Sequence, residues 1–375
     1  MSIRQYKAAV LQAEPCWFDK EAATQKTTKY IKEAAANGAL LLGLSECWIP
    51  GYPNFLWGGN YRENIPLVHK CMQNCITAHG PEMARIRQAA ADNNIYVMLG
   101  YSERAGGTLY ISNCFIDNKG KVLMARRKLK PTHIERTLFG DATGDSLNNV
   151  VDTPLGKIGV LNCWEHFQPL LKYHTYAQGE QVHIAAWPFN GEYLGLGEPW
   201  SVCNQANEVV ASQMYALEGQ AYVLVSNQCV SPEGAKTNSA GQGSSEGSFM
   251  LSGGGGNSGV FAPDGKKITE QVDALFEGLI YVDINLDDID YAKAIADPVG
   301  HYSRPDLLRL LVDDQPKHYR VKVRKESVDN AILEVQTDLT STFKSFEEAV
   351  AEHGISVTEA APIAVKEHVT VNGKS

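Results

Sequence analysis

The sequence lacks a hydrophobic run long enough to cross a bilayer, which takes roughly 18 consecutive apolar residues. It also lacks an excess of positive charge, since its formal net charge is −9. An acidic chain argues against nucleic acid and anionic membranes as partners. The N-terminus has no apolar core of a signal peptide and passes directly into a predicted strand, so we expect a cytoplasmic protein.

Paired cysteines are absent as well. The eight cysteines are scattered, which is typical of a reducing compartment and not of a disulfide scaffold. Cys71, Cys75 and His79 recur every four residues and would align on one helix face, but they lack the fourth ligand of a zinc site. We therefore expect no metal, and we interpret the two cysteines as core residues of a helix.

The most informative residue that is present is Cys163. An apolar run, Leu155–Asn162, predicts a buried strand before it, and His166–Gln178 has apolar residues at helical spacing after it. Pro169 falls in the first turn of that predicted helix, where a missing N–H costs little. At such a strand-to-helix junction a thiolate is stabilised by the helix dipole and by free backbone N–H groups. The alternative is an ordinary buried cysteine.

Two other segments place charged side chains at the ends of predicted strands. In Leu40–Pro53 an apolar strand runs into Glu46, and a carboxylate there is costly unless it is paired or functional. The segment Ala125–Arg136 ends a predicted strand and contains Lys128. Part of that basic segment is expected to be a solvated face.

These segments together resemble the nitrilase superfamily, and most closely its nitrilase branch. The similarity covers about residues 5–310 and has four motifs in the family's order. The motifs are RKLKPTHIER (127–136), NCWEHF (162–167), EQVHIAAWP (180–188) and DPVGHYSRPD (297–306). One departure is Leu44-Ser45, where family members usually have Phe-Pro before the catalytic glutamate.

The resemblance implies a catalytic triad of Glu46, Lys128 and Cys163, in that chain order. Lys128 is preferred to Lys130 because the family's lysine directly follows an arginine, although strand alternation points both to the same face. The resemblance also implies a second glutamate near the site, which is Glu135 here.

A surface ion pair between Glu135 and Arg136 is the alternative interpretation of that second glutamate. A Cys-His dyad that uses His133 or His166 is a rival to the triad.

The implied chemistry is hydrolysis of a nitrile to a carboxylic acid and ammonia through a thioimidate and a thioester on Cys163. Glu46 acts as general base and acid, and Lys128 and the backbone N–H of Trp164 stabilise developing negative charge. This chemistry requires no cofactor. Apolar residues that follow the predicted strand ends are candidates for the substrate pocket, namely Tyr52, Trp164, Trp187, Pro188 and Phe189.

The order of predicted strands and helices indicates an α/β protein with two mixed sheets and outer helices, and the family fold is a four-layer αββα sandwich. We expect one domain over residues 1–310 and a C-terminal extension over residues 311–375, which is a subunit-interface segment followed by a disordered tail. The Gly/Ser-rich residues 231–258 are predicted to be a flexible surface loop.

Two further functions remain open from the sequence. One is cyanide hydration, nitrile hydration or amide hydrolysis on the same fold, and the other is a non-catalytic scaffold that forms filaments. The family resemblance implies a homo-oligomer built from dimers, which can extend into a helical filament.

Overall fold

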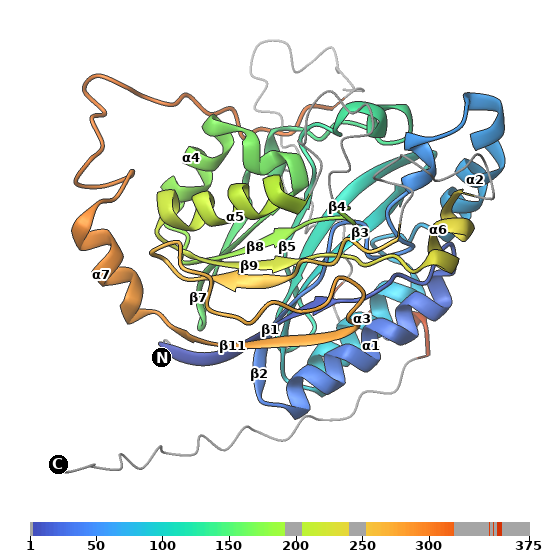
Figure 1. Ribbon diagram of the computed structural model, residues 1–375, viewed down its shortest axis with the longest axis horizontal. Helices are drawn as coiled ribbons and strands as arrows, with labels where there is room; N and C mark the ends of the chain where they lie inside the picture. The colour runs from blue at the N-terminus through green and yellow to red at the C-terminus, as the bar shows by residue number, and fades with distance from the viewer. Residues whose placement is uncertain are drawn as a thin grey trace, which may run out of the picture.

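Two β-sheets lie face to face in the computed structural model, with helices on their outer faces (Figure 1). The structure describes residues 3–191, 205–239 and 253–318, together with residues 345, 348 and 351–354. The first sheet has the strand order β11 (Gly278–Asn285), β1 (Gln5–Gln12), β2 (Ala39–Gly43), β3 (Tyr96–Ala105), β4 (Thr108–Ile116), β5 (Val122–Arg127). The second has the order β10 (Gly259–Phe261), β9 (Tyr222–Ser226), β8 (Val182–Ala186), β7 (Gly156–Asn162), β6 (Val150–Thr153).

Both sheets are mixed. In the first sheet β1, β2 and β3 are parallel neighbours, and in the second β7, β8 and β9 are. The remaining neighbours pair antiparallel, including β6 and β7, which are consecutive in the chain. Parallel neighbouring strands have their carboxyl ends at the same end of the sheet. Residues that directly follow β2 therefore lie at one end of the first sheet, and those that follow β7, β8 and β9 lie together at one end of the second.

Helices cover the outer faces of both sheets. The helices α1 (Lys20–Ala36) and α3 (Pro81–Asp92) lie on the first sheet, and α4 (Pro169–Ala177) and α5 (Gln205–Gly219) lie on the second (Figure 1). The remaining helices are peripheral: α2 (Tyr61–Asn74), α6 (Pro232–Ser239) and α7 (Asp287–Ile295). The described residues also form four short 3-10 helices: η1 (Asn54–Trp57), η2 (His133–Thr137), η3 (Gly144–Leu147) and η4 (Cys163–Phe167). This arrangement confirms the predicted αββα sandwich.

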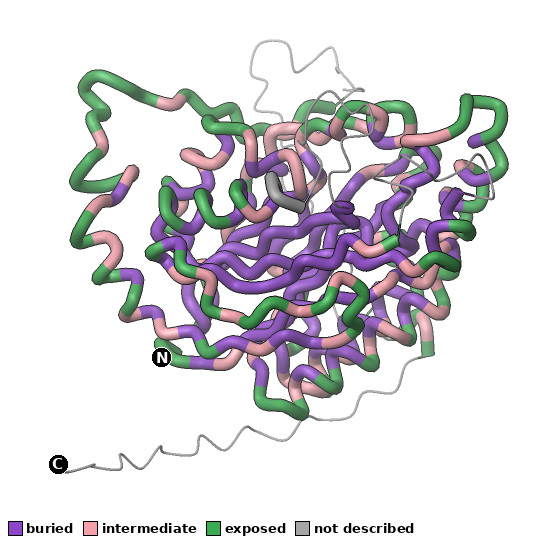
Figure 2. Tube along the Cα trace, viewed as in Figure 1, coloured by how far each residue is buried: buried purple, intermediate pink, exposed green. Residues whose placement is uncertain are grey.

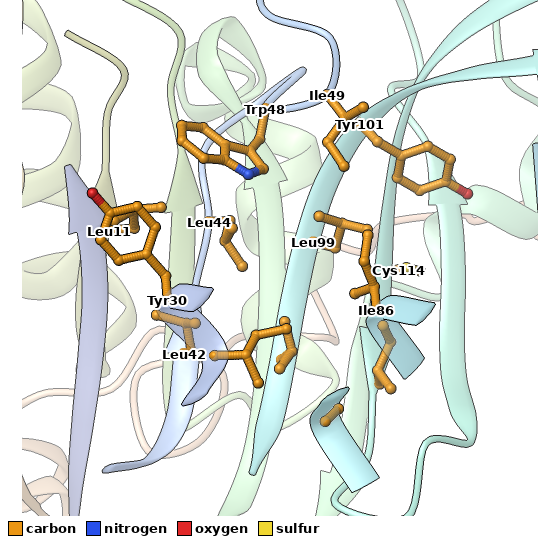
Figure 3. Packing of buried hydrophobic residues seen from close by; sticks show 14 of the residues in the cluster. Leu11, Tyr30, Leu42, Leu44, Trp48, Ile49, Ile86, Leu99, Tyr101 and Cys114 are labelled. Atoms are coloured by element: carbon orange, nitrogen blue, oxygen red, sulfur yellow. The ribbon is translucent and has the colours of Figure 1, made fainter. Parts of the chain in front are cut away.

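Strand alternation explains the layers. On β1 the side chains of Ala8 and Val10 enter the core between the sheets, and those of Ala9 and Leu11 enter the core beneath the helices. The strands are buried along most of their length, whereas the outward faces of the helices are exposed (Figure 2). Figure 3 shows the outer core of the first sheet, where Ile86 of α3 packs among strand residues. Each fully buried side chain of this kind stabilises the fold by about 1.5–3 kcal/mol.

The helix predicted over His166–Gln178 is divided in two. Cys163–Phe167 forms η4, Gln168 has an extended conformation, and α4 begins at Pro169. A residue that precedes proline is sterically disfavoured in the α region, which is why the helix breaks at Gln168.

The prediction of a flexible loop over residues 231–258 is wrong in part. Pro232–Ser239 is the helix α6, and several of its side chains are buried. Gly254 exchanges backbone hydrogen bonds with Val230. The glycine and serine content concealed this short helix, and residues 240–252 lie outside the described residues.

The helical alignment of Cys71, Cys75 and His79 is also wrong. The helix α2 ends at Asn74, and His79 is exposed beyond it. The two cysteines are buried, with sulfur atoms 4.0 Å apart. Within the described ranges there is no group of three side chains suited to a metal ion, and no helix is long and apolar enough to cross a membrane.

The predicted C-terminal extension lies mostly outside the described residues. Residues 311–318 are described, and they contain no helix or strand. The division at residue 310 and the interface role of the extension therefore stay predictions.

Candidate active site

Glu46 follows β2, and its backbone and that of Ser45 pass close to Gly100 of β3. A side chain at Gly100 of β3 would place its Cβ 2.1 Å from the carbonyl oxygen of Ser45, so glycine is required for this close approach. The N–H of Trp48 donates to the carbonyl of Gly100 at 3.1 Å. Gln228, which follows β9, donates to the carbonyl of Glu46 at 2.5 Å. The backbone around Glu46 is therefore tied to both sheets.

Lys128 lies just beyond β5 and is fully buried. Its Nζ donates to Oε1 of Glu46 at 2.8 Å and to Oε2 of Glu135 at 2.9 Å. Both carboxylates are buried as well. Lys130, by contrast, is exposed and forms an ion pair with Asp141. The structure thus separates the two lysines that strand alternation could not distinguish.

Glu135 belongs to η2, and its two oxygens are held by fixed donors. The hydroxyl of Tyr52 donates to Oε1 at 2.7 Å, and the N–H of Thr132 donates to Oε2 at 2.6 Å. The indole N–H of Trp57 in turn donates to the Tyr52 hydroxyl at 3.2 Å. Because Glu135 is only 1% exposed, the alternative of a surface pair with Arg136 is excluded.

Burial and charge act in opposite directions on this cluster. Burial raises the pKa of Glu46 to about 8, against the opposing effect of the Lys128 charge. Burial lowers the pKa of Lys128, but the negative charges of Glu135, Glu46 and Cys163 outweigh it and hold that pKa well above its usual value. Lys128 is therefore a permanent cation, whereas Glu46 can gain and lose a proton near neutral pH.

Cys163 follows β7 in the second sheet and begins η4. Its backbone φ of 45° lies in the left-handed region, which costs a residue other than glycine roughly 1–3 kcal/mol. The thiol is partly exposed, and its charge acts on Lys128 and Tyr52. Cys47 and His133, which lie beside the other site residues, also have left-handed backbone conformations.

A cavity of about 990 Å³ is lined by residues that follow Lys128 and Cys163 in the chain, although Glu46, Lys128 and Cys163 are not themselves part of its wall. Its wall contains Leu129, which follows Lys128, and Trp164, which follows Cys163. The other apolar side chains of the wall are Trp57, Pro131, Leu147, Pro169, Leu170, Leu171, Leu310, Leu311 and Val312. A cavity of this size and apolar lining suits a small organic molecule.

Comparison with known proteins places this arrangement in a family. The family model described as carbon-nitrogen hydrolase matches residues 7–294. The chain belongs to the carbon-nitrogen hydrolase family. This confirms the resemblance found in the motifs.

Similar sequences and structures agree with that assignment. An arylacetonitrilase of Aspergillus niger is 44% identical over 84% of this chain and 94% of its own length. A cyanide hydratase of Penicillium rubens is 41% identical over 89% of this chain and 93% of its own. The C. elegans NitFhit protein has a similar fold, with a TM-score of 0.63 at 20% identity over 85% of this chain and 70% of its own. A carbon-nitrogen hydrolase from Helicobacter pylori gives 0.62 at 17% identity, over 81% and 96%.

The predicted pocket residues of this carbon-nitrogen hydrolase occupy different positions. Trp164 lines the cavity, and Tyr52 contacts Glu135 beside it. Trp187, Pro188 and Phe189 are buried and lie outside the cavity wall as the described residues define it. A substrate role for all five stays a prediction.

The histidines of the proposed Cys-His dyad have other contacts. Nδ1 of His166 lies 2.7 Å from the carbonyl oxygen of Cys163, and its Nε2 lies 3.0 Å from Nε2 of His183. His133 stacks on Trp57 in the cavity wall, with ring centroids 5.5 Å apart. Since both ring nitrogens of His166 have these contacts, the geometry favours Glu46 over His166 as the base.

A buried ion pair that the sequence did not reveal connects the two sheets. Arg126 of β5 donates to both oxygens of Glu165 in η4, at 2.8 and 2.7 Å. Glu165 also accepts the N–H groups of Leu129 and Asn162. The spacing of Asn162 and Glu165 is that of a capping box, which was the only local signal. The pair links the strand before Lys128 to the helix that begins at Cys163.

Proposed function

We propose that this protein hydrolyses an organic nitrile to a carboxylic acid and ammonia, with Cys163 as the nucleophile. The observation that carries the proposal is the buried contact of Lys128 with both Glu46 and Glu135, at a position where the charge of Cys163 acts on Lys128. A nitrile carbon is a modest electrophile, so it requires a strong nucleophile, a proton donor for nitrogen and a fixed positive charge. The similarity to arylacetonitrilases supports a nitrile as substrate.

In the first step Glu46 takes the proton of the Cys163 thiol, and the sulfur attacks the nitrile carbon. The nitrogen receives that proton from Glu46, which gives a covalent thioimidate. Oε2 of Glu46 is buried and has no hydrogen-bond partner among the described residues, so it is the oxygen available for this transfer. Lys128 and the N–H of Trp164 stabilise the negative charge that develops on nitrogen.

In the following steps two water molecules are consumed. Glu46 activates the first water, which adds to the thioimidate carbon; the C–N bond then breaks and ammonia leaves with a proton from Glu46. A thioester remains on Cys163. The second water attacks the thioester in the same way, the acid is released, and the thiol recovers its proton. Glu135 accepts a hydrogen bond from Lys128 and holds it in place.

Leu129 and Trp164, which follow Lys128 and Cys163, belong to the wall of the apolar cavity, and this supports an organic nitrile with an apolar group over cyanide. Cyanide has two heavy atoms and gains nothing from an apolar space of about 990 Å³. Hydration of cyanide is nevertheless the second candidate, because relatives at 41–44% identity are named cyanide hydratases. On the same triad it would end at the amide.

The test is product analysis of the purified protein. The panel contains phenylacetonitrile, benzonitrile, an aliphatic nitrile and cyanide, with the matching amides. We expect acid and ammonia from phenylacetonitrile and no turnover by Cys163→Ala, whereas Cys16→Ala, which alters a cysteine outside the site, should behave as wild type. Accumulation of amide, or turnover of cyanide or amides alone, would overturn the proposal.

A second pair of variants tests the cation. Lys128→Met should lower kcat by at least about 100-fold, as expected when a stabiliser of developing charge is lost. Lys121→Met, at the other end of β5, removes an exposed lysine and should leave kcat unchanged. Equal activity of the two variants would remove Lys128 from the mechanism.

We also propose a cytoplasmic homo-oligomer built from dimers. Residues near the end of the described chain expose large apolar side chains, among them Tyr302, Leu308 and Leu311. Exposed apolar side chains in one segment favour burial against another subunit. Sedimentation of the purified chain should give at least a dimer, and a monomer at micromolar concentration would contradict this.

A further inference from the structure

A chain of buried polar side chains runs from the second sheet to the backbone of Cys163. The hydroxyl of Tyr215 in α5 donates to Oε2 of Glu180 at 2.7 Å. Oε1 of Glu180 lies 2.6 Å from Nδ1 of His183 in β8. Nε2 of His183 lies 3.0 Å from Nε2 of His166, whose Nδ1 lies 2.7 Å from the carbonyl oxygen of Cys163. The side chains of all four residues behind Cys163 are buried.

With both imidazole rings neutral, the last contact determines where each proton in this series of hydrogen bonds lies. A carbonyl oxygen only accepts, so Nδ1 of His166 carries a proton and, in a neutral ring, its Nε2 accepts. Nε2 of His183 must then donate, which leaves its Nδ1 as an acceptor. Glu180 must therefore carry a proton on Oε1 and accept from Tyr215 on Oε2. Each contact is satisfied without a net charge.

Burial favours this neutral arrangement over an ionic one. It raises the pKa of Glu180 to about 8 and lowers the pKa of both His166 and His183 well below the usual value. An ionic form would move the proton from Glu180 to Nδ1 of His183 and leave an ion pair in the interior, which is costly. These pKa shifts favour a protonated Glu180 and uncharged His166 and His183, which is the neutral arrangement.

The carbonyl at the end of the chain belongs to the same peptide unit as the N–H of Trp164. That peptide is trans and planar, so its C=O and N–H point in opposite directions. A hydrogen bond from His166 on one side of the peptide therefore fixes the direction of the N–H on the other side. Cys163 itself has a left-handed conformation, with φ of 45°.

We propose that Glu180, His183 and His166 are positioning residues that orient the Cys163–Trp164 peptide, so that the Trp164 N–H stabilises the charge developing on the substrate nitrogen. This inference rests on the proposed function, because it assigns a role in charge stabilisation at the same site. The three residues touch no reacting atom and act only through the backbone.

The residues around this series of hydrogen bonds pack closely against it. A Cβ on Gly159 of β7 would lie 1.9 Å from Oε1 of Glu180, so glycine at this strand position makes room for the carboxyl group. The ring of Tyr215 stacks on His183 with centroids 3.9 Å apart, and Trp187 stacks on His166 at 4.9 Å. These contacts give Trp187 a structural role behind the nucleophile.

The test compares His166→Phe with His166→Asn. Both variants deprive His183 of its acceptor, and phenylalanine preserves the stacking on Trp187. Only asparagine retains a donor near the Nδ1 position, so any recovery by asparagine, which lacks the stacked ring, is attributable to the bond to the Cys163 carbonyl. We expect His166→Phe to lower kcat about 10- to 100-fold with little change in KM, because a misdirected N–H loses part of its effect on the transition state. His166→Asn should recover most of that loss.

Alkylation of Cys163 by iodoacetamide separates positioning from damage to the nucleophile. This reaction develops no charge on a substrate nitrogen, so its rate in His166→Phe should stay within about threefold of wild type. The inference is overturned if kcat is unchanged in His166→Phe, if kcat and alkylation fall together, or if His166→Asn recovers nothing.

Variants at Glu180 test the far end of the chain without altering His166. The amide of Glu180→Gln can donate to His183 and accept from Tyr215, so kcat should stay within about threefold of wild type. Glu180→Leu breaks the chain and should lower kcat as His166→Phe does. Loss of activity in Glu180→Gln would contradict the neutral chain. A wild type that turns over no nitrile would instead overturn the proposed function.

Discussion

Two buried carboxyl groups, those of Glu165 and Glu180, lie behind the candidate nucleophile, and their pKa values are shifted in opposite directions. Glu165 faces Arg126 and two backbone N–H groups, and, although burial opposes it, these contacts hold the pKa of Glu165 below its usual value. Glu180 faces a tyrosine hydroxyl and a histidine, and burial raises its pKa to about 8. The difference shows that the partner, and not burial itself, decides whether an interior carboxyl group is charged.

The largest predicted effect comes from removing the partner of the charged carboxylate. Arg126→Met leaves Glu165 buried and unpaired, so the free energy of unfolding should fall by about 3–5 kcal/mol in urea denaturation. Arg85→Met is the matched control, because Arg85 forms a two-bond pair with Glu21 at the surface. That change should cost no more than about 1 kcal/mol. If Arg126→Met and Arg85→Met lowered the free energy of unfolding equally, the buried ion pair would differ in no way from the surface pair, and the prediction would be wrong.

A smaller effect is expected in the pH dependence of stability. The folded-state pKa of Glu180 lies above its unfolded value, so its contribution is present below about pH 4.5 and is lost as the pH rises towards 8. Glu165 has the opposite sign, and its contribution is lost as the pH falls. Glu180→Gln should therefore flatten the decline in stability between pH 5 and 8 by up to about 1.4 kcal/mol per pH unit. Thermal unfolding across this pH range measures the change, and an unaltered slope would mean that Glu180 is ionised in the folded protein.

The smallest effect should follow from Tyr215→Phe. This variant keeps the ring that stacks on His183 and removes only the donor to Glu180. The loss of one neutral hydrogen bond should cost about 1 kcal/mol of unfolding free energy. A loss near that of Arg126→Met would indicate a charged Glu180, and urea denaturation of the two variants side by side decides between these outcomes.

The sequence predicted those parts of the site that have a local pattern. Glu46, Lys128 and Cys163 each follow a predicted strand, and the structure brings Glu46 and Lys128 into contact. Their catalytic roles stay predictions. The sandwich was predictable because strand alternation and helical spacing are properties of neighbouring residues.

The remaining parts depend on contacts between distant segments. Arg126 lies in a basic segment that resembles a surface, and its partner Glu165 is 39 positions away. Tyr215 and Glu180 are likewise 35 positions apart, on different elements. The left-handed conformation of Cys163 is imposed by its surroundings and not by residue type, since cysteine has no preference for that region. No spacing rule predicts such contacts.

The candidate base and cation come from the first sheet, whereas the thiol comes from the second. If these residues act as proposed, the candidate triad is complete only after the two sheets have packed against each other. A newly made chain with both sheets formed but still apart carries an ordinary cysteine. Recovery of activity during refolding should therefore coincide with formation of the core between the two sheets. The rate at which activity returns would then measure the rate at which the sheets pack together.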